Sequence, residues 1–180
     1  MQSFLPYPEF VKSARVLDRQ RLGKQRIEAK LLLEISLGRE SRWSCHPASL
    51  MWQPYPWALA VYGWHICTEW IRRGYHDEQL PFFDQQIRLH RPNEVPPWLG
   101  DPRLHASHRA ALLFKLPKHY RQFGWSESPV IEYFWPVTED PYARRTGCLL
   151  QDEAGPRGAG AGAVPEPVVQ GRDQVATAPR

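Results

Sequence analysis

The spacing of helix-breaking residues limits this chain most strongly to an all-α fold. Apolar residues recur at helical intervals between Gly and Pro positions, and no hairpin signal such as Asn-Gly is present. A helix that ends before Gly38 and another that ends before Gly74 fit the usual place of glycine past a helix end. We therefore predict a compact, single-domain helical bundle. The expected helices are a short one after Pro8, then 18–37, 56–73 and 102–116, with a last turn in "PKHYRQF".

Two segments depart from this helical pattern. The segment "PVIEYFWPV" is predicted to be extended. Residues 149–180 are rich in Gly, Ala and Pro and have no aromatic side chain, so they cannot bury enough apolar surface to order themselves. The predicted organisation is a helical domain over residues 1–148 and a disordered tail over residues 149–180.

The charge of the chain makes polyanions the first class of partner to consider. The net charge is +4, and 18 of the 23 basic residues are Arg, which suits bidentate contacts with phosphate. The chain begins without the cationic and apolar regions of a signal peptide, and its longest apolar run, 57–64, is too short to span a membrane. Three scattered cysteines favour a reducing compartment. We expect a cytoplasmic, nucleoid-associated monomer with no membrane contact.

The sequence gives little support for metal or nucleotide chemistry. His105 and His108 are spaced to share a helical face, but no Cys, Asp or Glu joins them at ligand spacing. They form either a polar patch with Arg109 or an edge that contacts phosphate. Cys45 precedes His46, although neighbours in a turn seldom make a catalytic pair. No phosphate-binding glycine loop or GxSxG motif is present, so we expect no metal and no cofactor.

The segment "LDRQRLGKQRIEAK" combines a basic helical face with a single inner carboxylate, Glu28. Glu28 follows Lys24 by four residues, which makes an ordinary ion pair worth about 0.2–0.5 kcal/mol. Two interpretations stay open: a solvated basic face with a minor ion pair, or a phosphate-tracking face that brings nucleic acid to Glu28. The cations expected on one side, at spacings of 4, 7 and 4, are Arg15, Arg19, Arg26 and Lys30, with Arg21 and Lys24 widening the face.

The same segment resembles the active-site helix of the pyrimidine-dimer DNA glycosylases of the phage endonuclease V type. In that family a Gln, one further residue and a Leu are followed by five residues and then the catalytic Glu; these positions are Gln20, Leu22 and Glu28 here. The segments "HPASLMW", "CTEWIRRGY", "HASHRAALLFKLPKHY" and "IEYFWP" follow in the family's order. The start "MQSFLPY", together with "LDRQRLGKQRIE" and "PPWLGD", resembles a bacterial branch. The likeness covers residues 1–137.

This resemblance implies a DNA glycosylase with abasic-site lyase activity on pyrimidine dimers or related lesions in duplex DNA. Family members attack C1′ of the sugar with the terminal α-amine and form an imine, while a Glu assists; no metal takes part. An α-amine ordinarily has a pKa of about 7.7–8.0 and a lysine about 10.4, so far more of the former is uncharged at neutral pH. The alternatives are a non-catalytic nucleic-acid-binding protein that retains the fold and an unrelated enzyme on a similar bundle.

The expected site follows from the resemblance together with the basic face. The catalytic residues are Glu28 and the amine of Met1, or of Gln2 if Met1 is removed. Methionine is usually retained before a side chain as bulky as that of Gln2. The partner is damaged double-stranded DNA. Contacts with it are expected from Arg15, Arg19, Gln20, Arg21, Lys24, Arg26, His46, His105, His108, Arg109, Tyr133 and Trp135.

Overall fold

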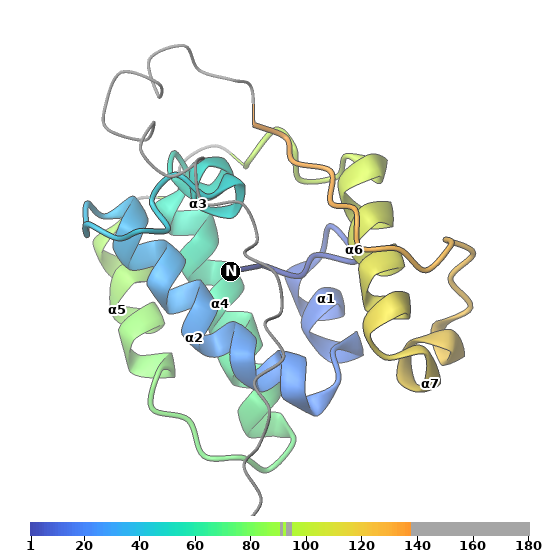
Figure 1. Cartoon of the computed structure of the whole chain (residues 1–180). Helices are drawn as coiled ribbons and strands as arrows, with labels where there is room; N and C mark the ends of the chain where they lie inside the picture. Colours follow the sequence, from blue (N-terminus) through green and yellow to red (C-terminus); the bar gives the residue numbers. More distant parts are fainter. Residues whose placement is uncertain (91, 93–94, 138–180) are drawn as a thin grey trace, which may run out of the picture. The chain divides into compact units, whose positions relative to one another are not determined.

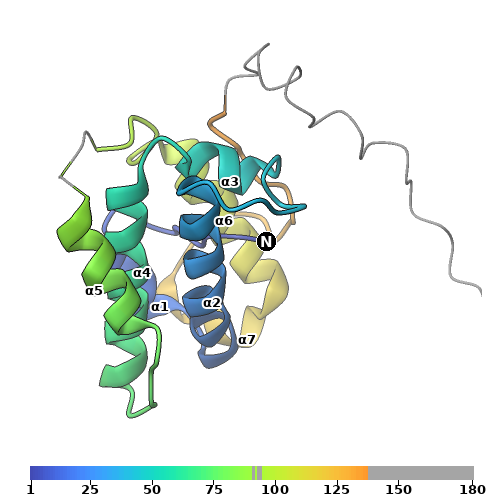
Figure 2. The same ribbon diagram turned by 90° about the vertical axis from the view of Figure 1, so that its left-hand side faces the viewer.

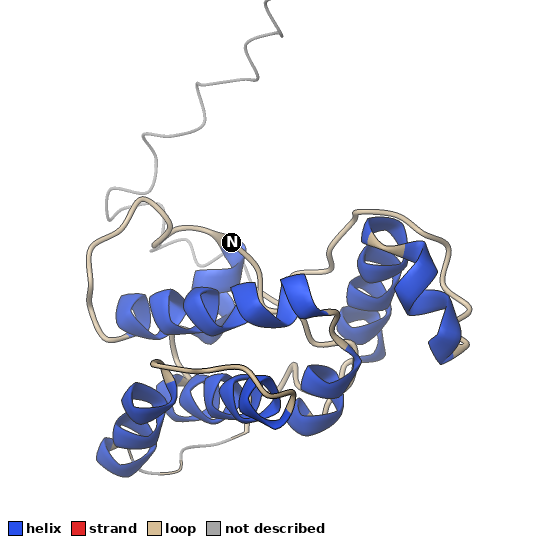
Figure 3. Cartoon of the chain, turned by 90° about the horizontal axis from the view of Figure 1, so that it is seen from below, coloured by secondary structure: helices blue, strands red, loops and turns tan. Residues whose placement is uncertain are grey.

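The computed structural model describes residues 1–90, 92 and 95–137, and within these residues it is helical without a strand (Figures 1 and 3). The predicted all-α fold is confirmed. Helix α4 is central because α1, α2 and α5 all pack against it, while α3 packs against α2. Figure 2 shows α5 beside α4. The elements are α1 Phe10–Val16, α2 Arg19–Ser36, α3 Pro47–Trp52, α4 Pro56–Arg72, α5 Leu80–Leu89, α6 Pro102–Lys115, α7 Pro117–Tyr120 and the 3-10 helix η1 Arg121–Phe123.

Helix α2 begins and ends close to its predicted limits. The carboxylate of Asp18 caps its first turn by accepting hydrogen bonds from the backbone N–H groups of Gln20 and Arg21. Gly38, at φ 98°, follows the last turn in a conformation that favours glycine. The predicted apolar positions are all buried: Leu22, Ala29, Leu32, Leu33 and Ile35.

Helix α4 confirms its predicted span. The face that it buries is not the one that carries most of its large residues. The large residues that repeat at helical spacing, such as Trp57 and Trp64, are only partly buried, and Ile71 is exposed. The fully buried positions include Tyr62 and Ile66. Many of the others are small, which lets neighbouring helices approach closely. The spacing of the large residues therefore identified the helix, while the fully buried face lies beside them.

Two helices and one loop were not anticipated from the sequence. Helix α3 has 6 residues, too few to show a period, and helix α5 follows a turn in which Asp77 accepts from two backbone N–H groups. The segment 129–137 forms no strand and runs as a loop packed on the core through its aromatic residues. The predicted tail, 149–180, lies outside the described residues. None of the described helices has the length and apolarity needed to cross a membrane.

The first six residues run through the helices without secondary structure of their own. Ser3 and Leu5 are fully buried, and hydrogen bonds reach the segment from four helices. The indole N–H of Trp52, on α3, donates to the Ser3 hydroxyl at 2.8 Å, and the hydroxyl oxygen of Tyr62, on α4, lies 3.1 Å from the Phe4 carbonyl oxygen. Helices α2 and α6 supply the remaining contacts. The start of the chain is therefore part of the core.

Candidate active site

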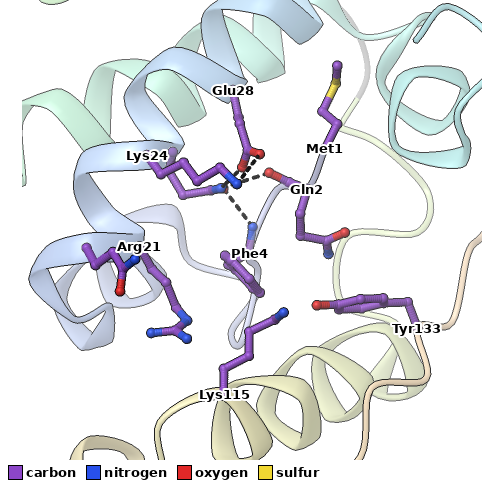
Figure 4. Close-up of a pocket in the computed structure, with 10 residues that line it drawn as sticks. Met1, Gln2, Phe4, Arg21, Lys24, Glu28, Lys115 and Tyr133 are labelled. Carbon is purple, nitrogen blue, oxygen red and sulfur yellow. Dashed lines mark hydrogen bonds and ion pairs between the residues drawn. The ribbon is translucent and has the colours of Figure 1, made fainter. Parts of the chain in front are cut away.

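A pocket of about 310 Å³ opens where the N-terminal segment passes α2 (Figure 4). It brings together the two predicted catalytic positions, Met1 and Glu28, with cationic groups from α2 and α6. The side chains of Arg21, Lys115 and Tyr133 point toward the same space in Figure 4. The lining residues are Met1, Gln2, Phe4, Gln20, Arg21, Lys24, Gln25, Glu28, Lys115 and Tyr133.

Glu28 is held inside the pocket by more than its ion pair with Lys24. Its Oε2 accepts a hydrogen bond of 2.7 Å from the amide of Gln25, and its Oε1 lies 3.5 Å from the Lys24 ammonium. The Glu28 side chain is only 14% exposed, whereas that of Lys24 is 72% exposed. Burial, followed by the charge of Glu28, raises the pKa of Tyr62 well above its ordinary value. A negative charge therefore faces both the pocket and the buried Tyr62 beneath it.

Met1 lines the pocket, and its side chain packs against the core. Its sulfur accepts a weak hydrogen bond of 3.9 Å from the Ser49 hydroxyl. Burial lowers the pKa of His46, and the positive charge of the terminal amine lowers it further, because this amine lies close to the ring. Gln2 is buried, and its side-chain amide lies 3.2 Å from Nε2 of His108. Met1 therefore lines the pocket next to the enclosed Gln2.

The predicted basic face divides into separate groups. Arg15 lies on α1, which ends before Asp18 caps α2, so the regular spacing does not place it on the same helix as the others. Arg26 turns away from the pocket, pairs with Asp77 and covers the ring of Trp70 at 4.8 Å. Lys30 likewise lies over Phe82 at 5.1 Å. The cations therefore do not form the single stripe that was expected. Arg15 lies on a different helix, and Arg26 and Lys30 lie over aromatic rings.

The remaining predicted cations of α2 lie toward its first turns. Arg21 lines the pocket and forms an ion pair of 2.7 Å with Asp18. Arg19 is exposed, with its guanidinium 5.2 Å from the ring of Tyr75, and Gln20 is exposed at the edge of the pocket. These residues and Lys24 offer polar groups to solvent beside Glu28.

The predicted contact residues of α6 lie beneath the surface. His108 is fully buried, and its Nδ1 accepts a hydrogen bond of 2.7 Å from the Leu5 N–H. Nδ1 of His105 contacts the Leu5 carbonyl at 2.7 Å. Arg109 donates to the Pro6 carbonyl and pairs with Glu127. These groups hold the N-terminal segment, and the expected contacts of these residues with phosphate stay a prediction.

Burial also sets the protonation of these rings. It lowers the pKa of His108 to about 3, with the charge of His105 a smaller cause. The pKa of His105 is lowered as well, mainly by burial. A neutral His108 is required for Nδ1 to accept from Leu5, so the low pKa and the hydrogen bond agree.

The aromatic loop closes over the same region. Tyr133 lines the pocket and meets His108 edge to face at 5.6 Å between ring centroids. Burial raises the pKa of Tyr133 to about 12, and the charge of Glu28 contributes. Trp135 meets His46 at 5.6 Å, close to the start of the chain. Tyr133 and Trp135 also meet each other, with their ring centroids 5.6 Å apart.

Sequence reasoning missed three residues of the pocket, Phe4, Gln25 and Lys115. Gln25 is fully buried at a position between Leu22 and Ala29 on the apolar side of α2. A polar residue on an otherwise apolar stripe was a signal that could have identified it. Lys115 lies at the end of α6, and no local pattern connects it with α2.

A second, more open hollow of about 620 Å³ lies along the same helix. Gly23 allows the Trp70 ring to approach α2, since a Cβ there would lie 3.1 Å from it. Gln20 and Lys24 border both hollows. The residues of this second hollow are Asp18, Arg19, Gln20, Gly23, Lys24, Trp70 and Leu116.

The described residues include no cluster of three or more His, Cys, Asp or Glu able to hold a metal ion.

Comparison with known proteins identifies one family. Residues 1–81 match the family model described as pyrimidine dimer DNA glycosylase. The match includes Met1, Gln25 and Glu28, and it confirms the family inferred from the sequence. No curated protein and no solved structure gives a significant match to the chain.

Proposed function

We propose that this chain, whose residues 1–81 match the family model of the pyrimidine dimer DNA glycosylases, combines base excision with abasic-site lyase activity. Pyrimidine dimers or related lesions in duplex DNA are the proposed substrates. One observation carries the proposal: Met1 and Glu28, distant in sequence, line one pocket. An amine and a carboxylate that face one sugar are the two groups this chemistry needs.

The proposed nucleophile is the terminal amine of Met1. It attacks C1′ of the damaged nucleotide while the bond from C1′ to the base breaks, and the base leaves with the bonding electrons and takes up a proton. The sugar ring then opens to give a protonated imine between C1′ and the amine. Removal of a proton from C2′ allows the 3′ phosphate to leave, and this elimination cuts the strand.

Glu28 is the proposed group that moves these protons and stabilises the cationic imine. Its Oε2 already accepts a hydrogen bond from Gln25. Oε1, which lies beside Lys24, is therefore the oxygen that remains available to the substrate. A carboxylate in a partly enclosed pocket interacts with a nearby cation more strongly than one in bulk water does. The position of Glu28 therefore supports a chemical role over the solvated ion pair.

The cations around the pocket are the proposed contacts for the phosphates that flank the lesion. Arg21 and Lys24 approach from α2, and Lys115 approaches from α6. Gln20 and Lys24 continue from this pocket to the second hollow. A pocket of about 310 Å³ cannot take a duplex, so the reacting nucleotide would have to leave the base stack. The proposed setting is bacterial-type nucleoid DNA in the cytoplasm, bound by a monomer.

Borohydride trapping on a duplex with an abasic site tests the nucleophile. We expect a covalent adduct that maps to Met1 by mass spectrometry of the digested protein. Lys24 and Lys115 are the other amines at the pocket, so an adduct on either would refute the assignment to Met1. No adduct under conditions that trap a known lyase would favour the non-catalytic DNA-binding alternative.

A Glu28→Gln variant tests the carboxylate. We expect it to bind the damaged duplex while strand cleavage is lost, because the amide keeps the shape of the side chain and removes its charge. Glu34→Gln is the matched control, since Glu34 lies on the same helix, pairs with Arg39 and does not line the pocket. Unchanged cleavage by Glu28→Gln would remove Glu28 from the proposed mechanism.

A further inference from the structure

We infer that Gln25 is a positioning residue for the proposed reaction: its side-chain amide fixes the start of the chain against Glu28. The inference rests on the proposed function, because it concerns how the amine and the carboxylate are held together. Gln25 is completely buried on α2, one turn before Glu28, and it lines the floor of the pocket. It has no role in the mechanism described above beyond its bond to Glu28.

The amide nitrogen of Gln25 makes the connection directly. It donates to the Gln2 backbone carbonyl at 2.8 Å and to Oε2 of Glu28 at 2.7 Å. A primary amide has two N–H groups, so both are used. The carboxylate and the backbone of residue 2 are therefore tied to the same nitrogen, and the amine of Met1 is one residue from that point.

The amide oxygen of Gln25 fixes the orientation of the group. It accepts from the Phe4 N–H at 2.9 Å and from the Tyr62 hydroxyl at 2.7 Å. Both acceptor sites are therefore occupied, and the amide cannot rotate by half a turn without losing all four bonds. The Tyr62 hydroxyl belongs to a fully buried residue of α4, which makes this anchor rigid.

This arrangement has a consequence for the reactive geometry. Four satisfied hydrogen bonds in a buried site restrict the relative motion of the N-terminal segment and α2. Catalytic groups displaced by about 1 Å can lose about 100-fold in rate. A local loss of the Gln25 bonds should therefore slow imine formation without removing the cations that bind DNA, because the hydrogen-bond partners of the Gln25 amide are Gln2, Phe4, Glu28 and Tyr62 and not those cations.

Two substitutions separate the parts of this network. Gln25→Met has a similar volume and removes all four bonds, while Gln25→Glu keeps the acceptors for Phe4 and Tyr62 and loses the paired donors. We expect both variants to lower the single-turnover rate of trapped imine formation by about 100-fold. The dissociation constant for the same duplex, measured by fluorescence anisotropy, should be unchanged. A residue with only a structural role would not separate rate from binding in this way.

Phe83→Leu provides the matched control for destabilisation. Phe83 is also fully buried, lies on α5 and does not line the pocket, so this variant should keep the wild-type rate at temperatures where it is folded. Tyr62→Phe supports the test if the Gln25 variants do not fold, because it removes only the anchoring hydroxyl and should slow imine formation while binding is retained. Wild-type rates in folded Gln25 variants would overturn the inference. The absence of any adduct with the wild-type protein would instead refute the proposed function.

Discussion

His108 should make the stability of the domain fall steeply in mild acid. The ring is fully buried, and its Nδ1 accepts from Leu5, so protonation would replace an acceptor with a donor that faces another donor. The perturbation is a change from pH 6.5 to pH 4.5 in the wild-type protein and in a His108→Gln variant. Glutamine can still accept a hydrogen bond from Leu5, but it has no titration in this range.

The size of the effect follows from the difference between the folded and unfolded states. The folded pKa of His108 is about 3, whereas an unfolded histidine ionises near 6.5. Between these values the unfolded state binds one more proton, so stability is lost as the pH falls, at about 1.4 kcal/mol per pH unit. The two-unit change should therefore cost about 2–3 kcal/mol, a large part of the roughly 5–15 kcal/mol typical of a domain.

Urea unfolding, followed by tryptophan fluorescence at several pH values, measures this directly. His46, His65 and His105 also have lowered pKa values and lose stability in the same direction, so the slope of the wild type alone is not diagnostic. The difference in slope between wild type and His108→Gln should correspond to about one proton. Parallel slopes for the two proteins would refute the link between burial, the Leu5 hydrogen bond and the low pKa.

Three further predictions concern packing, capping and the first residue. Gly63→Ala should lower the melting temperature, because its Cβ would lie 2.2 Å from the Phe83 ring and overpacking costs roughly 1–3 kcal/mol; an unchanged melting temperature would contradict this. Asp18→Ala should lower the unfolding free energy by about 1 kcal/mol or more in urea, through loss of the α2 cap; because the pKa of Asp18 is lowered, its contribution should be present above pH 4 and disappear in acid. A Gln2→Ala protein prepared with and without Met1 should form the trapped adduct only when Met1 is present, and equal trapping by both forms would assign the amine differently.

Local sequence was sufficient for the parts of the fold that depend on local chemistry. Helix α2 was predicted well because Asp18 and Gly38 mark its ends and its apolar positions repeat without interruption. The same reasoning failed for the cationic stripe, since it treated Arg15 and Arg19 as residues of one helix. Helical spacing applies only within one continuous helix, and α1 ends before α2 begins between these two residues.

The candidate pocket depends on contacts that no local pattern contains. The neighbours of the N-terminal segment on α6 are 100 or more residues away, and the two histidines among them could equally have faced solvent. Gln25 differs, because a polar residue at a core position already indicated a buried hydrogen-bond network. Its partners could not be inferred, because periodicity identifies a face of a helix and not the segment that covers it.

The path of the first six residues also bears on the order in which the domain can assemble. These residues are made before α6, yet Leu5 must wait for His108, 103 positions later, before its N–H is satisfied. Contacts of such long range slow folding because a large loop must close before they form. A nascent chain that stops before α6 would hold Glu28 on a complete helix and still have no assembled pocket. The proposed reactivity of the terminal amine would therefore require a chain in which α6 has already been made.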